Sequence, residues 1–207
     1  MTKITLEEAR DILLPLVGQT IDASDFGNKN KGKYGHAVEK MLGLDLGSHA
    51  LDFLNGELKT TGIVKVKDQY KVKEDFKICK VWDKNYIEAK LKNMLVLCYD
   101  YHTKEIVSVQ VYNILEHPLV REQFDKDVDW LLEQPDINVV SQTATPVFVA
   151  KTNSKGGNAP KERACYIAGA PASYLLGFDY PKGARKGKDQ VKSWIEYNEQ
   201  TEARQAA

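Results

Sequence analysis

The middle of the chain is dominated by segments with the composition of β-strands. Between residues 51 and 115, four stretches are rich in β-branched and aromatic residues, and one short stretch between them has helical spacing. The predicted strands cover residues 51–54, 57–67, 94–102 and 105–115, and the predicted short helix covers residues 84–92. Because helical patterns also lie on both sides of this region, the sequence favours an α/β fold with a central mixed β-sheet flanked by helices.

The flanking helices are indicated by capping and periodicity. Thr5 and Glu8 form a capping-box pattern, and apolar residues follow at helical spacing to Val17. Further elements are expected as helices over 34–44, 119–134 and 188–202, a helical turn over 172–178, and short strands over 146–151 and 163–168. No internal repeat or long linker is visible. We therefore expect one domain over residues 1–180 and a basic, helix-prone C-terminal tail over residues 181–207.

The cysteines indicate a reducing compartment. Cys79, Cys98 and Cys165 are odd in number and widely spaced, which is typical of buried thiols rather than of a disulfide frame or a zinc site. No apolar stretch approaches the roughly 20 residues of a membrane span. Acidic residues occupy the N-terminal positions that are apolar in a signal peptide. These features predict a cytoplasmic protein that makes no use of a membrane.

Charge is balanced in total but segregated along the chain. Residues 59–92 contain ten lysines and five acids, whereas residues 100–136 contain nine acids and three basic residues. Such segregation can build one face that attracts a polyanion such as nucleic acid. Charged, solvated loops explain the composition equally well.

The most informative short segment runs from Asp52 to Thr60. If the chain is extended from Glu57 onward, Glu57 and Lys59 point to the same face, since side chains alternate along a strand. Asp52 lies one short turn upstream, and Gly56 permits a tight bend. Two carboxylates and an ammonium group can therefore converge on one small volume.

This trio suits metal-dependent hydrolysis of a phosphodiester. The carboxylates of Asp52 and Glu57 offer the hard oxygen ligands that Mg²⁺ prefers. The cation polarises the phosphate and activates water, while Lys59 orients the water and offsets developing charge. Taken alone, however, an Asp, a Glu and a Lys at this spacing are also found as an ordinary ion pair on a surface strand.

The surrounding motifs resemble the MutH-type endonuclease family. The resemblance is carried by Lys31-Gly32-x-x-Gly35-x-x-x-Glu39, by Leu51-Asp52-Phe53 and by Gly56-Glu57-Leu58-Lys59. It extends through Ala89-Lys90-Leu91-Lys92 and Lys155-Gly156-Gly157-Asn158 to Cys165-Tyr166-Ile167, in the family's order. This resemblance implies the PD-(D/E)xK restriction-endonuclease-like fold, Mg²⁺ as the cofactor and double-stranded DNA as the partner and substrate.

The resemblance also assigns expected roles to individual residues. Asp52, Glu57 and Lys59 would be catalytic, with Asp52 and Glu57 as the metal ligands, and Glu39 would help to place metal or water. The residues implied to lie along DNA are Lys31, Lys90, Lys155, Asn158 and Tyr166.

Two departures from the family pattern leave alternatives open. The spacing between Asp52 and Glu57 is shorter than in the mismatch-repair nickase, and residues 168–171 lack the lysine pair found there. We expect a type II restriction-like endonuclease, with a GATC-type site carried over from the family. The protein would act as a monomer or as a DNA-induced dimer. The alternatives are a mismatch-repair nickase with a repair partner and a non-catalytic DNA-binding module of the same fold.

Overall fold

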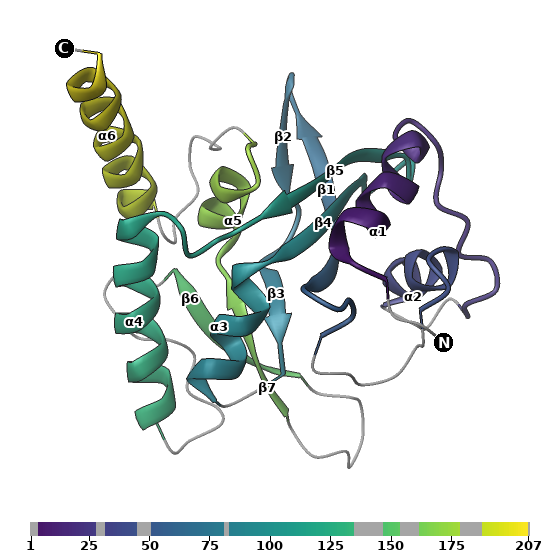
Figure 1. Ribbon diagram of the computed structural model, residues 1–207, viewed down its shortest axis with the longest axis horizontal. Coiled ribbons are helices and arrows are strands. Elements are labelled where there is room, and N and C mark those ends of the chain that lie inside the picture. Colours follow the sequence, from purple (N-terminus) through teal and green to yellow (C-terminus); the bar gives the residue numbers. More distant parts are fainter. Residues whose placement is uncertain are drawn as a thin grey trace.

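The computed structural model is a mixed α/β structure, and it describes residues 4–27, 32–44, 51–80, 83–134, 147–153, 162–178 and 188–206. The helices are α1 (Leu6–Leu13), the 3₁₀ turn η1 (Leu14–Leu16), α2 (Lys33–Met41), α3 (Lys84–Lys92), α4 (Pro118–Glu133), α5 (Gly169–Leu175) and α6 (Lys188–Gln205). The strands are β1 (Glu57–Val66), β2 (Gln69–Val72), β3 (Phe76–Cys79), β4 (Met94–Asp100), β5 (Ile106–Tyr112), β6 (Phe148–Asn153) and β7 (Glu162–Ile167). Figure 1 shows their arrangement.

The strands form two sheets. A four-stranded sheet has the order β2-β1-β4-β5, in which β1 and β4 are parallel and the other pairs are antiparallel. An antiparallel three-stranded sheet has the order β3-β7-β6. The predicted mixed sheet is therefore present, and the chain has a second sheet that the sequence did not separate from it.

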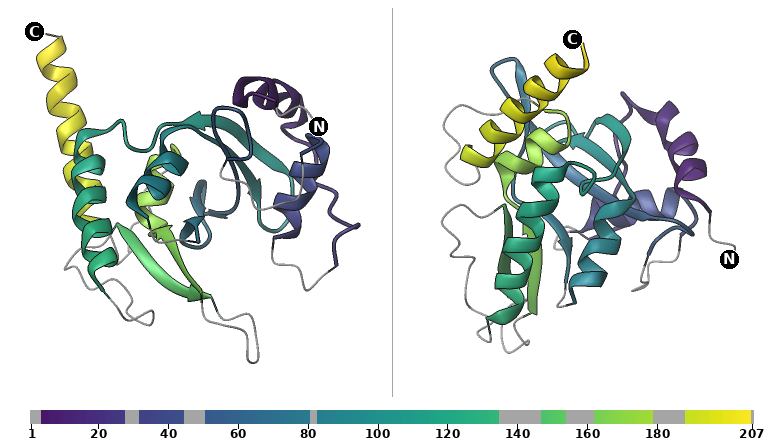
Figure 2. Two further views of the ribbon diagram at one scale, coloured as in Figure 1. Left: turned by 60° about the horizontal axis from the view of Figure 1, so that its bottom comes forward. Right: turned by 60° about the vertical axis from the view of Figure 1, so that its left-hand side comes forward.

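Two hydrophobic clusters pack on opposite faces of the four-stranded sheet. One joins α1 and α2 to Leu58, Leu95 and Leu97 of the sheet. The other joins the second sheet and helices α3, α4, α5 and α6 to the opposite face, through residues such as Val96 and Cys98. Adjacent residues of β4 thus enter different cores, as strand alternation requires. Figure 2 shows the helices around the sheets from two further directions.

The limits of several elements differ from the prediction for identifiable reasons. The first helix ends at Leu13 and continues as η1, because Pro15 has no N–H to donate to the preceding turn. Residues 51–54 are not a strand: the Phe53 N–H donates to Gly56 O at 3.0 Å, which closes a turn. The lysine-rich segment 69–79 contains β2 and β3, which were not predicted.

Other predictions are confirmed. β1 covers nearly all of the predicted strand 57–67, and α3 has the predicted bounds. The capping box is present, with Glu8 N–H donating to Thr5 Oγ1 at 3.2 Å. Cys79, Cys98 and Cys165 are free and buried, as expected.

The C-terminal helix α6 is partly integrated into the domain. Val191 and Trp194 are buried in the core that also contains α5 residues, and Asn198 Nδ2 donates to Tyr174 Oη at 2.9 Å. The C-terminal end of the helix extends away from the body (Figure 1). Residues 181–187 lie outside the described residues. None of the helices that the structure describes has the length and apolar character needed to span a membrane.

Candidate active site

A cavity lies beside the first half of β1, where one edge of the strand has no paired neighbour among the described residues. β4 pairs with β1 from Glu57, whereas β2 pairs with it only from Ile63. The cavity has a volume of about 560 Å³. Its lining comes from α2, the turn before β1, β1 itself, β3 with Lys80, and α3: Gly32, Gly35, His36, Glu39, Asp52, Glu57, Leu58, Lys59, Thr60, Lys77, Ile78, Cys79, Lys80, Tyr86 and Lys90.

Glu57 is the most enclosed ionisable group of this cavity. Its residue is only 3% exposed, and its two carboxylate oxygens form ion pairs with the ammonium groups of Lys59 and Lys90. Lys59 follows two positions later on β1, so the expectation that the two side chains share a face is confirmed. Lys90 comes from α3 and is itself 4% exposed. A buried carboxylate of this kind requires such partners, because an unpaired buried charge is strongly destabilising.

Asp52 is held beside the start of β1 by the turn that precedes the strand. Its Oδ2 accepts a hydrogen bond from Leu58 N–H at 2.9 Å. The tight turn also brings Gly56 against α1 and the α3–β4 connection, since a Cβ at Gly56 would lie 2.4 Å from Leu6 Cδ1 and 2.8 Å from Asn93 O. The short spacing between Asp52 and Glu57 therefore leaves both carboxylates at the same cavity.

Glu39 brings a third carboxylate to the cavity from α2. The side chain is half-buried, and burial raises the pKa of Glu39, with a further upward contribution from the nearby charge of Asp52. Among the described residues Glu39 has no ion pair or hydrogen bond from its side chain. The charge of Asp52 thus acts on Glu39, and the charges of His36 and Lys59 offset it only in part.

The donor set at the cavity fits a magnesium ion in its chemistry. Glu39 and Asp52 present oxygen ligands, and their mutual repulsion is the kind that a divalent cation relieves. In the part of the chain that the structure describes, no group of three or more His, Cys, Asp or Glu side chains is arranged to hold a metal ion. Both oxygens of Glu57 are paired with lysine ammonium groups, so Glu57 would bind a cation only after one of these lysines moves.

Several lining residues were not singled out from the sequence. Tyr86 lies one turn before Lys90 on α3, with the Lys90 ammonium 5.2 Å from the ring centroid, and the i,i+4 spacing could have indicated this pair. Lys77 and Lys80 reach the cavity from the β3 side, which the sequence did not predict as a strand. Burial raises the pKa of the Cys79 thiol to about 11, so this cysteine is protonated near neutral pH and is a poor nucleophile.

Of the five residues expected along DNA, the structure describes Lys90 and Tyr166. Lys90 lines the cavity, but as a buried partner of Glu57. Tyr166 lies on β7, half-buried, outside the cavity lining, with the Lys151 ammonium 5.3 Å from its ring centroid. Lys31, Lys155 and Asn158 lie outside the described residues.

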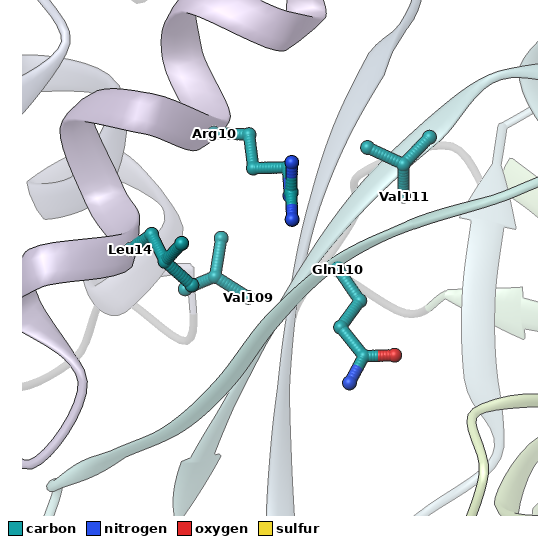
Figure 3. Close-up of a pocket in the computed structure, with 5 residues that line it drawn as sticks. All are labelled: Arg10, Leu14, Val109, Gln110 and Val111. Carbon is teal, nitrogen blue, oxygen red and sulfur yellow. The ribbon is translucent and has the colours of Figure 1, made fainter.

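A second hollow, of about 390 Å³, lies between α1 with η1 and the edge strand β5 (Figure 3). Its lining residues are Arg10, Leu14, Val109, Gln110 and Val111. Arg10 is the single ionisable group in this lining, so the hollow lacks the acid–base pairs that the first cavity offers. The candidate active site is therefore the cavity beside β1.

Comparison with known proteins gives no assignment. No family model matches the chain, and no curated protein has a matching sequence.

Proposed function

We propose that the protein is a Mg²⁺-dependent endonuclease that hydrolyses phosphodiester bonds in double-stranded DNA. The observation that carries the proposal is the convergence of Asp52, Glu57 and Lys59 on one cavity bordering β1. Lys90 and Glu39 join them from two separate helices. Within this proposal the mixed α/β architecture is a PD-(D/E)xK fold of the MutH type, as the sequence resemblance implies.

The side chains divide the work according to their environments. Asp52 and Glu57 would hold the Mg²⁺ ion, Glu57 after one of its two lysine partners has moved, with Glu39 placed to hold the ion or to orient water. When bound, the ion would supply polarisation of the scissile phosphate. Lys59, at 19% side-chain exposure, is the accessible ammonium of the pair at Glu57, and it positions the attacking water and offsets charge developing on the phosphate. Lys90, on α3, holds the Glu57 side chain in position through their buried ion pair.

Two further parts of the proposal rest on chemistry around the site. A type II restriction-like enzyme is favoured over a mismatch-repair nickase, because residues 168–171 lack the lysine pair of the nickase. Three buried free thiols suit the reducing conditions of the cytoplasm. The enzyme would act as a monomer or as a dimer formed on DNA.

A non-catalytic DNA-binding module is the second candidate, and one observation favours it. Both oxygens of Glu57 are paired with lysines, so metal binding at Glu57 requires at least one ammonium to move. In that case the charged cavity would grip phosphate without cleaving it.

The test is incubation of purified protein with supercoiled plasmid, unmethylated or adenine-methylated, in Mg²⁺ or in EDTA. Discrete linear fragments formed only with Mg²⁺ are expected, and their ends identify the recognition site. Open circles alone would assign the nickase. Intact plasmid from a folded protein that still binds DNA would refute the endonuclease and support the binding module.

A further inference from the structure

Three tyrosines and three lysines gather at the end of β1 and β4 that lies beyond the candidate active site. We call this group the tyrosine–lysine cluster; it consists of Lys33, Tyr34, Lys73, Tyr99, Tyr101 and Lys104. The members come from α2, from the residue after β2, and from β4 and the hairpin that follows it. Residues distant in sequence thus meet at one surface.

The inner part of the cluster is a stacked aromatic pair. The rings of Tyr34 and Tyr99 have centroids 4.9 Å apart and are tilted by 40°. Gly62 of β1 lies directly beneath, since a Cβ there would come within 3.5 Å of the Tyr99 ring and 3.4 Å of Tyr101. A Cβ at Gly62 would be in ordinary van der Waals contact with both rings, so the backbone of β1 lies close beneath the cluster.

The outer part is Tyr101, which is 37% exposed and surrounded by ammonium groups. Lys73 Nζ lies 3.0 Å and Lys104 Nζ 4.1 Å from the centroid of its ring. A hydrogen bond from Lys73 and the charge of its ammonium lower the pKa of Tyr101. Lys104 Nζ also lies 5.2 Å from the centroid of the Tyr34 ring, so this ammonium group is close to both the inner and the outer part of the cluster.

The hairpin that carries Tyr101 and Lys104 is fixed by its own hydrogen bonds. Asp100 Oδ1 accepts from His102 N–H at 2.7 Å and from Thr103 N–H at 3.0 Å. Lys104 has a positive φ of 65°, and its N–H donates to Asp100 O at 2.9 Å. An exposed aromatic ring is therefore held in a defined position rather than on an unstructured loop.

We propose that the tyrosine–lysine cluster binds an unpaired nucleotide of the DNA strand, with a base stacked on Tyr101 and the adjacent phosphates held by Lys73 and Lys104. Aromatic rings interleaved with cations are the usual means of binding single-stranded nucleic acid, because every base has a face that can stack and every phosphate a charge. Phosphates draw the two ammonium groups away from the ring, which exposes its face to the base. This inference deepens the proposed function and rests on it, since it takes DNA as the ligand.

The cluster is continuous with the candidate active site. Gly32 and Gly35 of the cavity lining flank Lys33 and Tyr34. α2 approaches β1 closely there, since a Cβ at Gly35 would lie 3.3 Å from Thr60 Oγ1. From Glu57 to Gly62 the strand advances by about 16 Å at roughly 3.3 Å per residue. That span corresponds to about five nucleotide steps at roughly 3.4 Å per step of one duplex strand. A strand whose scissile phosphate lies at Glu57 can therefore reach Tyr101.

Two carboxylates lie near the lysines of the cluster, so a ligand must be anionic to compete with them for the ammonium groups. Glu74 Oε1 is 3.7 Å from Lys73 Nζ, and the Asp100 carboxylate lies within the same hairpin. The Asp100 oxygen is already engaged by backbone N–H groups, whose hydrogen bonds lower the pKa of Asp100. Glu74 is the competing partner that phosphate must displace from Lys73.

The test measures binding separately from cleavage. The Lys59→Ala protein in EDTA is titrated, by fluorescence anisotropy, with a blunt duplex and with the same duplex carrying a single-stranded extension. We expect tighter binding of the extended probe. Tyr101→Ala should weaken binding of the extended probe about 5- to 150-fold, the range for loss of one base–aromatic stack, and should change the blunt duplex little. Tyr101→Phe should retain the preference, because it keeps the ring.

Tyr197 on α6 supplies a matched control, because it is also 37% exposed and its ring lies 5.5 Å from His117 rather than in the cluster. Tyr197→Ala should bind both probes as the parent does. Equal affinity of the parent for the two probes, or an equal loss on both probes in Tyr101→Ala, would overturn the inference. A wild-type protein that prefers the extension but never cuts DNA in Mg²⁺ would refute the endonuclease alone.

Discussion

At the scale of single residues, the site is defined by how its three carboxylates are compensated. Glu57 is buried with two lysines, Asp52 accepts one backbone hydrogen bond, and Glu39 has no polar partner among the described residues. In functional sites, neighbouring acids commonly lie in different environments, and these differences give similar groups different roles. Burial and the charge of Asp52 raise the pKa of Glu39, so a cation bound beside this carboxyl would favour its ionised form.

Replacement of Glu39 by Gln should stabilise the protein in a pH-dependent way. The folded-state pKa of Glu39 is raised above 4.5 by burial and by Asp52, so its contribution to stability is fully present below pH 4.5 and is lost as pH rises through the folded-state pKa. Glu39→Gln should thus have a larger free energy of unfolding than wild type at pH 7, and the difference should shrink towards pH 4.

Urea denaturation at the two pH values measures this difference. Added Mg²⁺ should narrow the difference at pH 7 by stabilising wild type more than the variant. A gap between the two proteins that is the same at pH 4 and pH 7 would show that the Glu39 carboxylate is not perturbed.

Part of the site could be predicted at this scale, and part could not. Strand alternation is enough to place Glu57 and Lys59 on one face, since it depends only on local geometry. The pairing of Glu57 with Lys90 depends on how α3 packs beside β1, 33 positions along the chain, and no local pattern contains it. The resemblance placed Lys90 near the DNA or the catalytic site, and its ammonium lies in the cavity as a buried ion-pair partner of Glu57.

At the scale of elements, long periodic segments were predictable and short polar strands were not. β1 and α3 have continuous patterns that tertiary packing does not override. β2 and β3 have four residues each and contain lysines, so their sequences do not indicate strands. Their extended conformation depends on pairing with β1 and β7. The cavity wall formed by β3 was missed for the same reason.

Gly56→Ala should destabilise the protein and impair the site. A Cβ at this position would lie 2.8 Å from Asn93 O, a backbone atom that also accepts the Glu57 N–H at 3.0 Å. Relief of this clash requires movement of the start of β1, at a cost of about 1–3 kcal/mol in the free energy of unfolding. Chemical denaturation measures the loss, and plasmid cleavage should fall with it because Glu57 is displaced.

Gly27→Ala is the matched control, because a Cβ at Gly27 would meet no atom of the described residues within 4 Å. This variant should have wild-type stability and cleavage. Equal stability of the Gly56 and Gly27 variants would show that the turn before β1 tolerates a side chain and that its close packing does not position Glu57.

At the scale of the whole molecule, the cavity lies where elements of the two hydrophobic cores meet. α2 belongs to the core with α1, whereas α3 and β3 belong to the other core, and all three line the cavity. The acid from α2 and the lysine from α3 therefore approach β1 from separately packed parts of the domain. The sequence indicated one central sheet but not this division, which arises from the second sheet.

The C-terminal helix should contribute to the stability of the whole domain. Trp194 is 2% exposed and its ring lies 5.9 Å from that of Tyr174 on α5 and 6.1 Å from His117. Trp194→Ala should lower the free energy of unfolding by about 3–5 kcal/mol through loss of buried area and a residual cavity. Tyr197→Ala, on the exposed part of α6, should cost far less in the same urea titration. Similar stabilities for the two variants would mean that α6 does not pack on the core in solution.

The central claim is that Lys59 acts with Asp52 and Glu57 in Mg²⁺-dependent cleavage, and single-turnover cleavage tests it most directly. Plasmid is cut by excess protein in Mg²⁺, with wild type beside Lys59→Ala and beside Lys126→Gln, whose exposed lysine pairs with Glu122 on α4. Lys59→Ala should bind DNA but cleave it at least about 100-fold more slowly, the usual effect of removing a group that assists proton transfer. Lys126→Gln should cleave at the wild-type rate. Equal rates for Lys59→Ala and wild type, or no cleavage by wild type, would contradict the account.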